Sequence, residues 1–160
     1  MTTSINSFNQ PNNTALAGQA SFNVPVSVTQ STKGDAVKAL TILRGFIGRR
    51  QLLVIGDLCY GEERQFFIDK LVELAELVGS MPVTFQTDGQ GDQAIVQLHY
   101  FTTGADWYIT ERDCETEQLQ AFGKADLGYG AELGYISIVE LLECGAEMDL
   151  HWTPKKLEEL

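Results

Sequence analysis

The sequence predicts an α+β protein, in which an antiparallel sheet of four to five strands carries two to three helices on one face. Apolar residues recur at helical spacing as far as Val78, and after Pro82 the pattern changes to the alternation that is typical of strands. Turn-forming residues separate the short alternating segments, so we expect successive strands to pair antiparallel. A chain of 160 residues with 44% hydrophobic content favours a single domain, which we place at residues 34–160.

Residues 1–33 are rich in Asn, Gln, Ser and Thr, and Lys33 is their only charged residue. Such a segment buries too little apolar surface to offset the entropy lost on ordering, so we expect a flexible tail. The segment from Phe22 to Val28, which includes Val24–Val28, alternates like a short strand, although Pro25 would restrict it to a sheet edge. A linker is the alternative interpretation. The tail shows no secretory or transit signal, which favours a cytoplasmic protein.

Two helices are predicted before the sheet. The first covers residues 35–48, with Asp35 as its cap and Gly48 as its end. Lys38 and Arg44 within it, together with Arg49 and Arg50 directly after it, make this helix region basic. The second covers Glu62 to Val78, where apolar residues share one face and the charged residues are placed toward water. Gly79 and Pro82 are expected to end it.

After Pro82 we predict five short strands, a short helix and a final helix start. The strands are placed at 83–87, 94–101, 107–111, 119–122 and 147–152. The segments 89–92 and 103–106 are expected to connect strands as hairpins. Ser137 is a suitable cap for a short helix over 138–144 that stops at Gly145, and Thr153-Pro154 is typical of a helix start.

Strand alternation places several polar side chains on one sheet face. Val96, Leu98 and Tyr100 are expected on the opposite, apolar face. Met148, Leu150 and Trp152 are expected to point away from the polar face as well. The candidate binding face comprises Gln97, His99, Tyr108, Thr110, Gln120, Asp149 and His151. A plain solvated sheet face is the alternative, and Phe122 weakens the placement of Gln120 because it shares its side.

No reaction can be assigned from these residues, and we expect no catalytic residue, no metal and no cofactor. His99, His151 and the carboxylates lack the ligand spacing of a metal site along the chain. Cys114 lies between Asp113 and Glu115, whose charge suppresses the reactive thiolate. The three cysteines are odd in number and have no CxxC pair, which favours free thiols.

A glycine-rich stretch at 123–134 is the second candidate site. It is not a phosphate-binding P-loop, because Gln118 and Ala125 stand where that motif requires a glycine and a Ser or Thr. We predict a compact loop packed by Leu127, Tyr129 and Leu133. Its candidate residues are Asp126, Gly128, Tyr129, Gly130, Glu132 and Gly134.

Charge is unevenly distributed along the chain. Residues 1–56 hold five basic and one acidic side chain, whereas residues 57–160 hold six basic and twenty-one acidic ones. The acidic part repels nucleic acid and attracts basic surfaces, so direct nucleic-acid binding is disfavoured and a basic protein partner is expected. Two roles stay open for the basic segment 33–50: weak binding to nucleic acid, or docking on an acidic surface of the same or a neighbouring molecule. No apolar stretch is long enough to span a membrane.

Several motifs resemble a bacterial family of unknown function. They are Asp106–Glu111 (DWYITE), 126–137 (DLGYGAELGYIS) and 149–154 (DLHWTP), within a resemblance over about residues 62–160. Members of that family resemble accessory proteins carried on plasmids, prophages and integrative conjugative elements. The resemblance implies a genomic context and carries over no catalytic residue.

Charge and resemblance together favour a non-enzymatic protein-binding module of a mobile genetic element. Such a module would act against host defences or present carboxylates where a partner expects DNA phosphates. The high negative charge also serves solubility, which is the simpler explanation. The alternative function is a small ligand-binding or catalytic domain in element transfer or DNA processing. Strand addition through Val24–Val28 is a third possibility.

Overall fold

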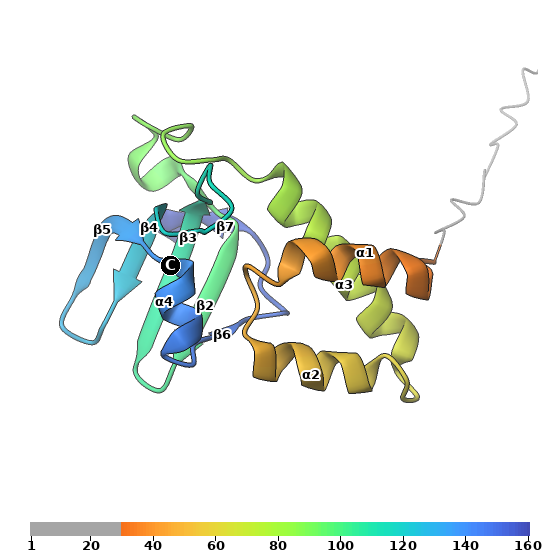
Figure 1. The fold of residues 1–160 in the computed structure, drawn as a ribbon. Helices are drawn as coiled ribbons and strands as arrows, with labels where there is room; N and C mark the ends of the chain where they lie inside the picture. The colour runs from red at the N-terminus through yellow and green to blue at the C-terminus, as the bar shows by residue number, and fades with distance from the viewer. Residues whose placement is uncertain (1–29) are drawn as a thin grey trace, which may run out of the picture.

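The computed structural model describes residues 30–160, so the Val24–Val28 segment lies outside the described residues. Three helices lie together on one side, and a five-stranded antiparallel sheet with a fourth helix lies on the other (Figure 1). The predicted α+β class is confirmed. A second sheet of two short strands completes the strand content of this part of the chain.

The first helix, α1, spans Lys33–Leu43 and begins earlier than predicted. Thr32 is its N-cap, and its side chain accepts a hydrogen bond from the Asp35 N–H while the Asp35 carboxylate accepts one from Thr32 N–H. Asp35 is therefore the third residue of a capping box and not the cap. Residues 31–33 join the folded unit, since Ser31 N–H also donates to Asp69 at 2.8 Å.

Gly48 begins a helix where the sequence predicted an end. The chain turns after Leu43, buries Phe46 and Ile47, and starts α2 (Arg49–Leu58) with Gly48 at the N-cap. The prediction of one helix over 35–48 is wrong because the apolar spacing continues through this buried connection. Gln51 of α2 then contacts the sheet: its amide donates to Met148 O at 2.7 Å and accepts from Met148 N–H at 3.1 Å.

The longest helix, α3, spans Arg64–Ser80 and buries one face as predicted. Its buried residues are Ile68, Leu71, Leu74, Ala75 and Val78. Gly79 lies inside the helix, and Met81 forms its C-cap immediately before Pro82. The last helix, α4 (Ile138–Glu143), has Ser137 as the predicted cap, since Ser137 Oγ accepts from Glu140 N–H, and Gly145 follows it with φ +86°.

The large sheet has the strand order β5-β4-β3-β2-β6. Its strands are β2 (Leu98–Thr102), β3 (Ala105–Glu111), β4 (Ala121–Asp126), β5 (Ala131–Ile136) and β6 (Glu147–Met148), and every pairing is antiparallel. A two-residue turn at Thr103-Gly104 joins β2 to β3, as predicted, with Gly104 at φ +90°. The small sheet pairs β1 (Ile95–Val96) with β7 (Lys155–Lys156).

Three strand predictions need correction. Residues 83–87 form turns, with one isolated bridge from Val83 to Arg112, and not a strand. Residues 89–92 do not form the predicted hairpin connection, because Gly91 begins a 3₁₀ turn, η1 (Gly91–Gln93). The strand predicted at 94–101 is broken at Gln97 into β1 and β2. The strand predicted at 147–152 stops at Met148, and the predicted C-terminal helix is β7 followed by a 3₁₀ turn, η2 (Leu157–Glu159).

The main core lies between the helices and one face of the sheet. Leu98, Tyr100 and Ile109 face it together with the buried residues of α1 and α3. The Tyr100 hydroxyl donates to Phe46 O at 2.7 Å, and complete burial raises the pKa of this hydroxyl well above its ordinary value. No helix within residues 30–160 combines the length and apolar character needed to cross a bilayer.

Candidate functional site

The sheet has a second face, turned away from the main core, which we call the open face. Its residues follow from the strand register, in which His99 pairs with Tyr108, Tyr108 with Lys124, and Lys124 with Leu133. One step further along the strands, Glu111 pairs with Phe122 and Phe122 with Tyr135. Because these pairs alternate with the core-facing rows, the open face includes His99, Tyr108, Lys124, Leu133, Glu111, Phe122 and Tyr135. Asp106 and Asp126, which pair with each other, lie on the same face.

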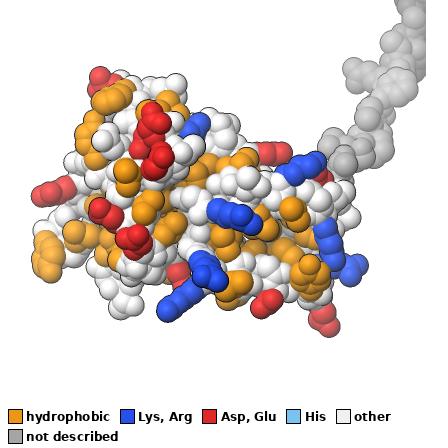
Figure 2. All heavy atoms as spheres, viewed as in Figure 1, with side chains coloured by type: hydrophobic (Ala, Val, Ile, Leu, Met, Phe, Trp, Pro, Cys, Tyr) orange, Lys and Arg blue, Asp and Glu red, His pale blue; other side chains and the backbone are white. Residues whose placement is uncertain are grey.

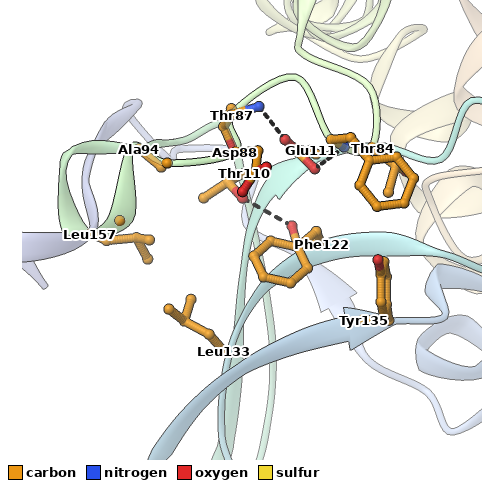
Figure 3. Close-up of a pocket in the computed structure, with 13 residues that line it drawn as sticks. Thr84, Thr87, Asp88, Ala94, Thr110, Glu111, Phe122, Leu133, Tyr135 and Leu157 are labelled. Carbon is orange, nitrogen blue, oxygen red and sulfur yellow. Dashed lines mark hydrogen bonds between the residues drawn. The ribbon is translucent and has the colours of Figure 1, made fainter.

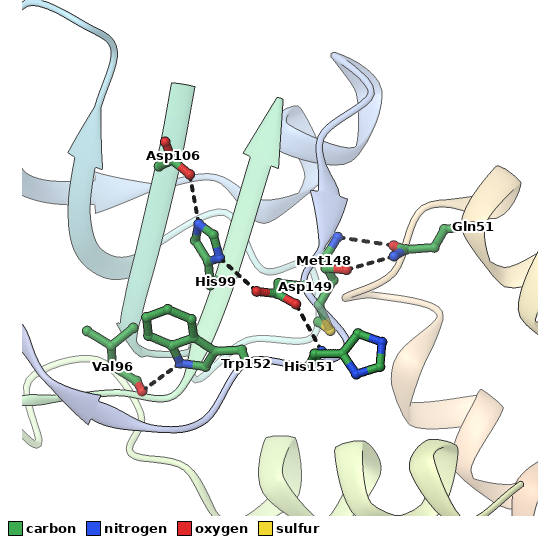
Figure 4. Close-up of polar contacts among 8 residues, drawn as sticks. All are labelled: Gln51, Val96, His99, Asp106, Met148, Asp149, His151 and Trp152. Carbon is green, nitrogen blue, oxygen red and sulfur yellow. Dashed lines mark hydrogen bonds and ion pairs between the residues drawn. The ribbon is translucent and has the colours of Figure 1, made fainter. Parts of the chain in front are cut away.

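His99 forms a polar cluster at one end of the open face (Figure 4). Its Nε2 lies 2.8 Å from Asp106 Oδ1 and its Nδ1 lies 3.3 Å from Asp149 Oδ2. The imidazole stacks on Tyr108 with ring centroids 4.9 Å apart and an interplanar angle of 8°. Trp152 covers the cluster at a centroid distance of 4.9 Å from the imidazole, and only 13% of the His99 side chain is exposed.

The electrostatic surroundings of this cluster are acidic. Burial and the nearby carboxylates of Asp106 and Asp126 raise the pKa of the Tyr108 hydroxyl. Asp106 and Asp126 are direct cross-strand neighbours, an arrangement of like charges that destabilises a sheet unless a cation lies close. Both ring nitrogens of His99 lie within hydrogen-bond distance of carboxylates, so the imidazole bridges Asp106 and Asp149.

Other predicted members of the polar face lie elsewhere. His151 follows β6 in a turn, and its ring stacks on Phe66 of α3 at 6.1 Å, pointing away from His99 (Figure 4). Trp152, expected on the opposite side, packs against His99 and Tyr108 because the strand ends at Met148. Gln97 marks the break between β1 and β2, and Gln120 is exposed in the turn before β4.

The break at Gln97 also moves Val96 out of the main core. Val96 packs with Ala94 and Leu157 in a small separate cluster, against which Tyr108 and Trp152 lie. The Trp152 indole N–H donates to Val96 O at 3.1 Å. Alternation across this break therefore failed to predict the face correctly, since Leu98 and Tyr100 belong to the main core and Val96 does not.

A β-bulge in β3 shapes the other end of the open face. Ile109 pairs with Gly123 and Glu111 with Phe122, so Thr110 is the extra residue. Thr110 is buried, and its hydroxyl donates to Phe122 O at 3.1 Å. Glu111 is only 3% exposed, and its carboxylate accepts N–H donors from Phe85, at 2.8 Å, and from Thr87.

The turn segment 82–91 is held over the sheet by these contacts. Thr84 Oγ1 donates to Gln120 O at 2.9 Å, and Thr84 N–H donates to Arg112 O at 2.9 Å. Phe85 has φ +77°, an uncommon conformation for a residue with a side chain, and 72% of it is exposed. The hydrogen bond from Phe85 N–H to Glu111 helps to hold this backbone conformation in place.

A cavity of about 540 Å³ lies between this turn segment and the open face (Figure 3). Its polar lining comes from the turn and the bulge and includes Asp88, Thr110 and Glu111. Its apolar lining consists of Phe85, Ala94, Phe122, Leu133, Tyr135 and Leu157. The sequence does not predict this cavity, because a strand at 83–87 would leave no turn to form its wall.

The predicted glycine-rich loop is mostly a β-hairpin. Asp126 ends β4, Gly128 and Gly130 lie in the turn at φ +85° and +121°, and Glu132 and Gly134 lie within β5. Tyr129 is 97% exposed at the tip, and Leu127 and Leu133 are each half exposed, so these side chains do not pack the loop. The glycines serve the turn and the strand pairing, and β5 forms one edge of the sheet.

Gly123 is required by close approach of the neighbouring strand. A Cβ atom at this position would overlap the carbonyl oxygen of Tyr108 and lie 3.0 Å from Ile109 Cα. Gly123 pairs with Ile109, immediately before the bulge at Thr110. The glycine therefore allows the β3–β4 pairing from which both the His99 cluster and the cavity are built.

The turn before β4 is organised by a buried carboxylate. Asp113 accepts N–H donors from Glu115, Leu119 and Gln120 at 2.8 to 3.0 Å. Burial raises the pKa of Asp113, but these N–H donors and Cys114 outweigh it, so the pKa is lowered overall. Cys59, Cys114 and Cys144 are free thiols, as predicted, and burial raises the pKa of Cys59.

The fold and site define an α+β protein with an acidic sheet whose open face carries an aromatic cavity. Within residues 30–160, no group of three or more His, Cys, Asp or Glu side chains is placed to hold a metal ion. The chain matches the family described as protein of unknown function DUF2958 over residues 73–153, and it belongs to this family. No curated protein and no solved structure matches it.

Proposed function

We propose that this chain is a non-enzymatic binding module that docks a basic protein partner on the open face of its sheet. The distribution of charge over the fold supports this most directly. Residues 82–154 contain thirteen acidic and two basic side chains, so they account for the net charge of −11, while residues 30–81 contain seven of each. In Figure 2 acidic side chains predominate over the sheet, whereas basic and acidic side chains are mixed over the helices.

Exposed apolar side chains also occur within the acidic residues 82–154, which we call the sheet unit. Phe85, Leu133 and Tyr135 line the cavity and are each at least half exposed. Exposed aromatic residues surrounded by polar groups are typical of the centre of a protein interface, where they act as anchors. The acidic surroundings would attract a basic partner and repel nucleic acid, which is why we favour a protein partner.

The cellular setting of this function is also proposed. The resemblance at DWYITE and its companion motifs supports an accessory protein of a plasmid, prophage or conjugative element, acting in the cytoplasm. A basic partner in that setting would be a DNA-binding protein of the host or of the element. Carboxylates of the sheet unit would then compete with DNA phosphates for the same basic surface, which would give an anti-defence activity.

A ligand-binding or catalytic role is the second candidate, and the His99 cluster is the observation that favours it. A general base needs a ring nitrogen free to reach a substrate proton. Both nitrogens of His99 already lie at carboxylates, and no Ser, Thr or Cys side chain within residues 30–160 is hydrogen-bonded to the ring. The arrangement is better suited to holding Asp106 and Asp149 in place than to proton transfer.

A pull-down from bacterial lysate tests the proposed function. The tagged full chain is used at low and moderate salt, with and without competing duplex DNA, and recovered proteins are identified by mass spectrometry. We expect a basic nucleic-acid-binding protein that duplex DNA displaces. A partner retained despite DNA would support a specific interface and contradict mimicry. Recovery of no protein above background would contradict the binding module and favour the ligand-binding or catalytic role.

A further inference from the structure

The cavity between residues 82–91 and the open face has room for one long side chain. Its volume of about 540 Å³ falls within the roughly 300–1,000 Å³ of typical ligand pockets. From its lining we infer that it holds the side chain of an arginine from the bound partner. This inference rests on the proposed function, because it identifies what the acidic sheet would recognise in a basic protein.

The charge of the lining selects a cation. Glu111 and Asp88 are the charged residues of the lining, which includes no Lys, Arg or His. Glu111 is almost completely buried, and no basic side chain within residues 30–160 forms an ion pair with it. A buried carboxylate without a counterion is unfavourable even when N–H groups bind it, so a cation entering the cavity gains a partner there.

The aromatic residues favour a planar cation. Tyr135 meets Phe122 edge to face, with centroids 5.6 Å apart and an interplanar angle of 75°. It meets Phe85 in the same manner at 6.4 Å and 74°. A guanidinium group stacks on such rings and donates hydrogen bonds in its plane, whereas an ammonium group does not stack. Arginine therefore fits the combination of rings and carboxylates better than lysine.

Other occupants fit less well. A phosphate would be repelled by Glu111 and Asp88, and a purely apolar ligand would leave Glu111 without a counterion. Two basic residues of the chain itself adjoin residues of the lining. Arg112 follows Glu111 and donates through Nη1 to Asp113 O at 3.2 Å. Lys156 precedes Leu157. Its ammonium group is already bound to Gln93, at 2.6 Å, and to Glu158, at 3.3 Å.

An NMR titration of the full chain with N-acetylarginine amide tests this inference. We expect saturable shifts of the backbone amides of Thr87, Glu111 and Tyr135. N-acetylcitrulline amide has the same shape without the charge, and it should bind at least about fivefold more weakly. N-acetyllysine amide should also bind more weakly than the arginine probe. Tyr135→Ala should weaken arginine binding, whereas Tyr129→Ala, on the same hairpin but outside the cavity, should leave it unchanged.

Three results would overturn the inference: equal binding of citrulline, tighter binding of lysine than of arginine, or no shift around the cavity. The spectrum of each variant shows directly whether it is folded. Failure here can be distinguished from failure of the proposed function. If lysate yields a basic partner but the arginine probe does not bind, the function stands and the arginine site is wrong. If the probe binds but lysate yields no partner, the site stands and the proposed function is wrong.

Discussion

The Glu111 carboxylate accepts a hydrogen bond of 2.8 Å from the backbone N–H of Phe85. A second one, from Thr87 N–H, engages the other carboxylate oxygen. Glu111 comes from the bulge of β3, and Phe85 and Thr87 come from the turn segment that closes the cavity. One buried side chain therefore connects the shape of a strand to the wall of the candidate site.

Glu111→Gln should loosen this wall. Glutamine places an NH₂ donor against one of the two backbone N–H groups, so we expect a loss of about 2 kcal/mol in the free energy of unfolding. Hydrogen exchange should accelerate at Phe85 and Thr87. Asp88→Asn is the control, since Asp88 is exposed and its replacement should leave exchange in this segment unchanged. Unaltered exchange in Glu111→Gln would show that Glu111 does not hold the turn.

The His99 cluster should be sensitive to loss of Asp149. Asp149→Asn removes a charged partner of the ring, and we expect a loss of about 1 kcal/mol in urea denaturation. Asp126→Asn is a matched control on the same face, because Asp126 is not hydrogen-bonded to His99. The Asp126→Asn substitution also relieves the repulsion between residue 126 and Asp106 across the strand pair. The free energy of unfolding of this variant should therefore rise by about 0.5 kcal/mol. Equal losses in both variants would contradict this account.

Asp113 should make the fold acid-sensitive. Its pKa is lowered in the folded state, so its contribution to stability is present above the unfolded value of 3.8 and is lost as pH falls through the folded value. Asp113→Asn should lower stability by about 2 kcal/mol at pH 7. The difference from wild type should shrink as the pH falls below 3.8, as followed by thermal unfolding. A difference that stays constant with pH would contradict this role.

Gly123→Ala should disturb the pairing of β3 and β4. The added methyl group overlaps the backbone of Tyr108, which no side-chain rotation can relieve. We expect a loss of about 3 kcal/mol, or failure to fold. Gly134→Ala is the control, because a Cβ at Gly134 meets no atom within 4 Å. Equal behaviour of the two variants in thermal unfolding would show that the close approach is absent.

Patterns within single elements predicted much of the fold. The apolar face of α3, the Ser137 cap of α4 and the hairpin at Gly104 all depend on residues close in sequence. The sequence predicts a continuous helix through the connection at 44–48, because Phe46 and Ile47 keep helical spacing. In the structure these two residues are buried by tertiary packing and lie between two helices. The sequence predicts a loop in place of β5, because Gly134 lies within this strand and Gly128 and Gly130 lie just before it.

The candidate site was less predictable than the fold. His99 and Tyr108 came together as the alternation of two adjacent strands indicated. His151 did not join them, because β6 ends after two residues and the chain turns toward α3. The cavity depends on the bulge at Thr110 and on the turn at Phe85, where long-range hydrogen bonds fix the backbone. Local sequence carries no signal for such contacts.

Site-specific photocrosslinking tests the central claim most directly. Tyr135 of the open face is replaced by p-benzoylphenylalanine, and Leu53 of α2, also exposed, is replaced in the same way as a control. After irradiation in bacterial cells, we predict an adduct with a basic protein from position 135 and none from position 53. An adduct from position 53 alone, or none from position 135, would contradict binding of a basic partner at the open face.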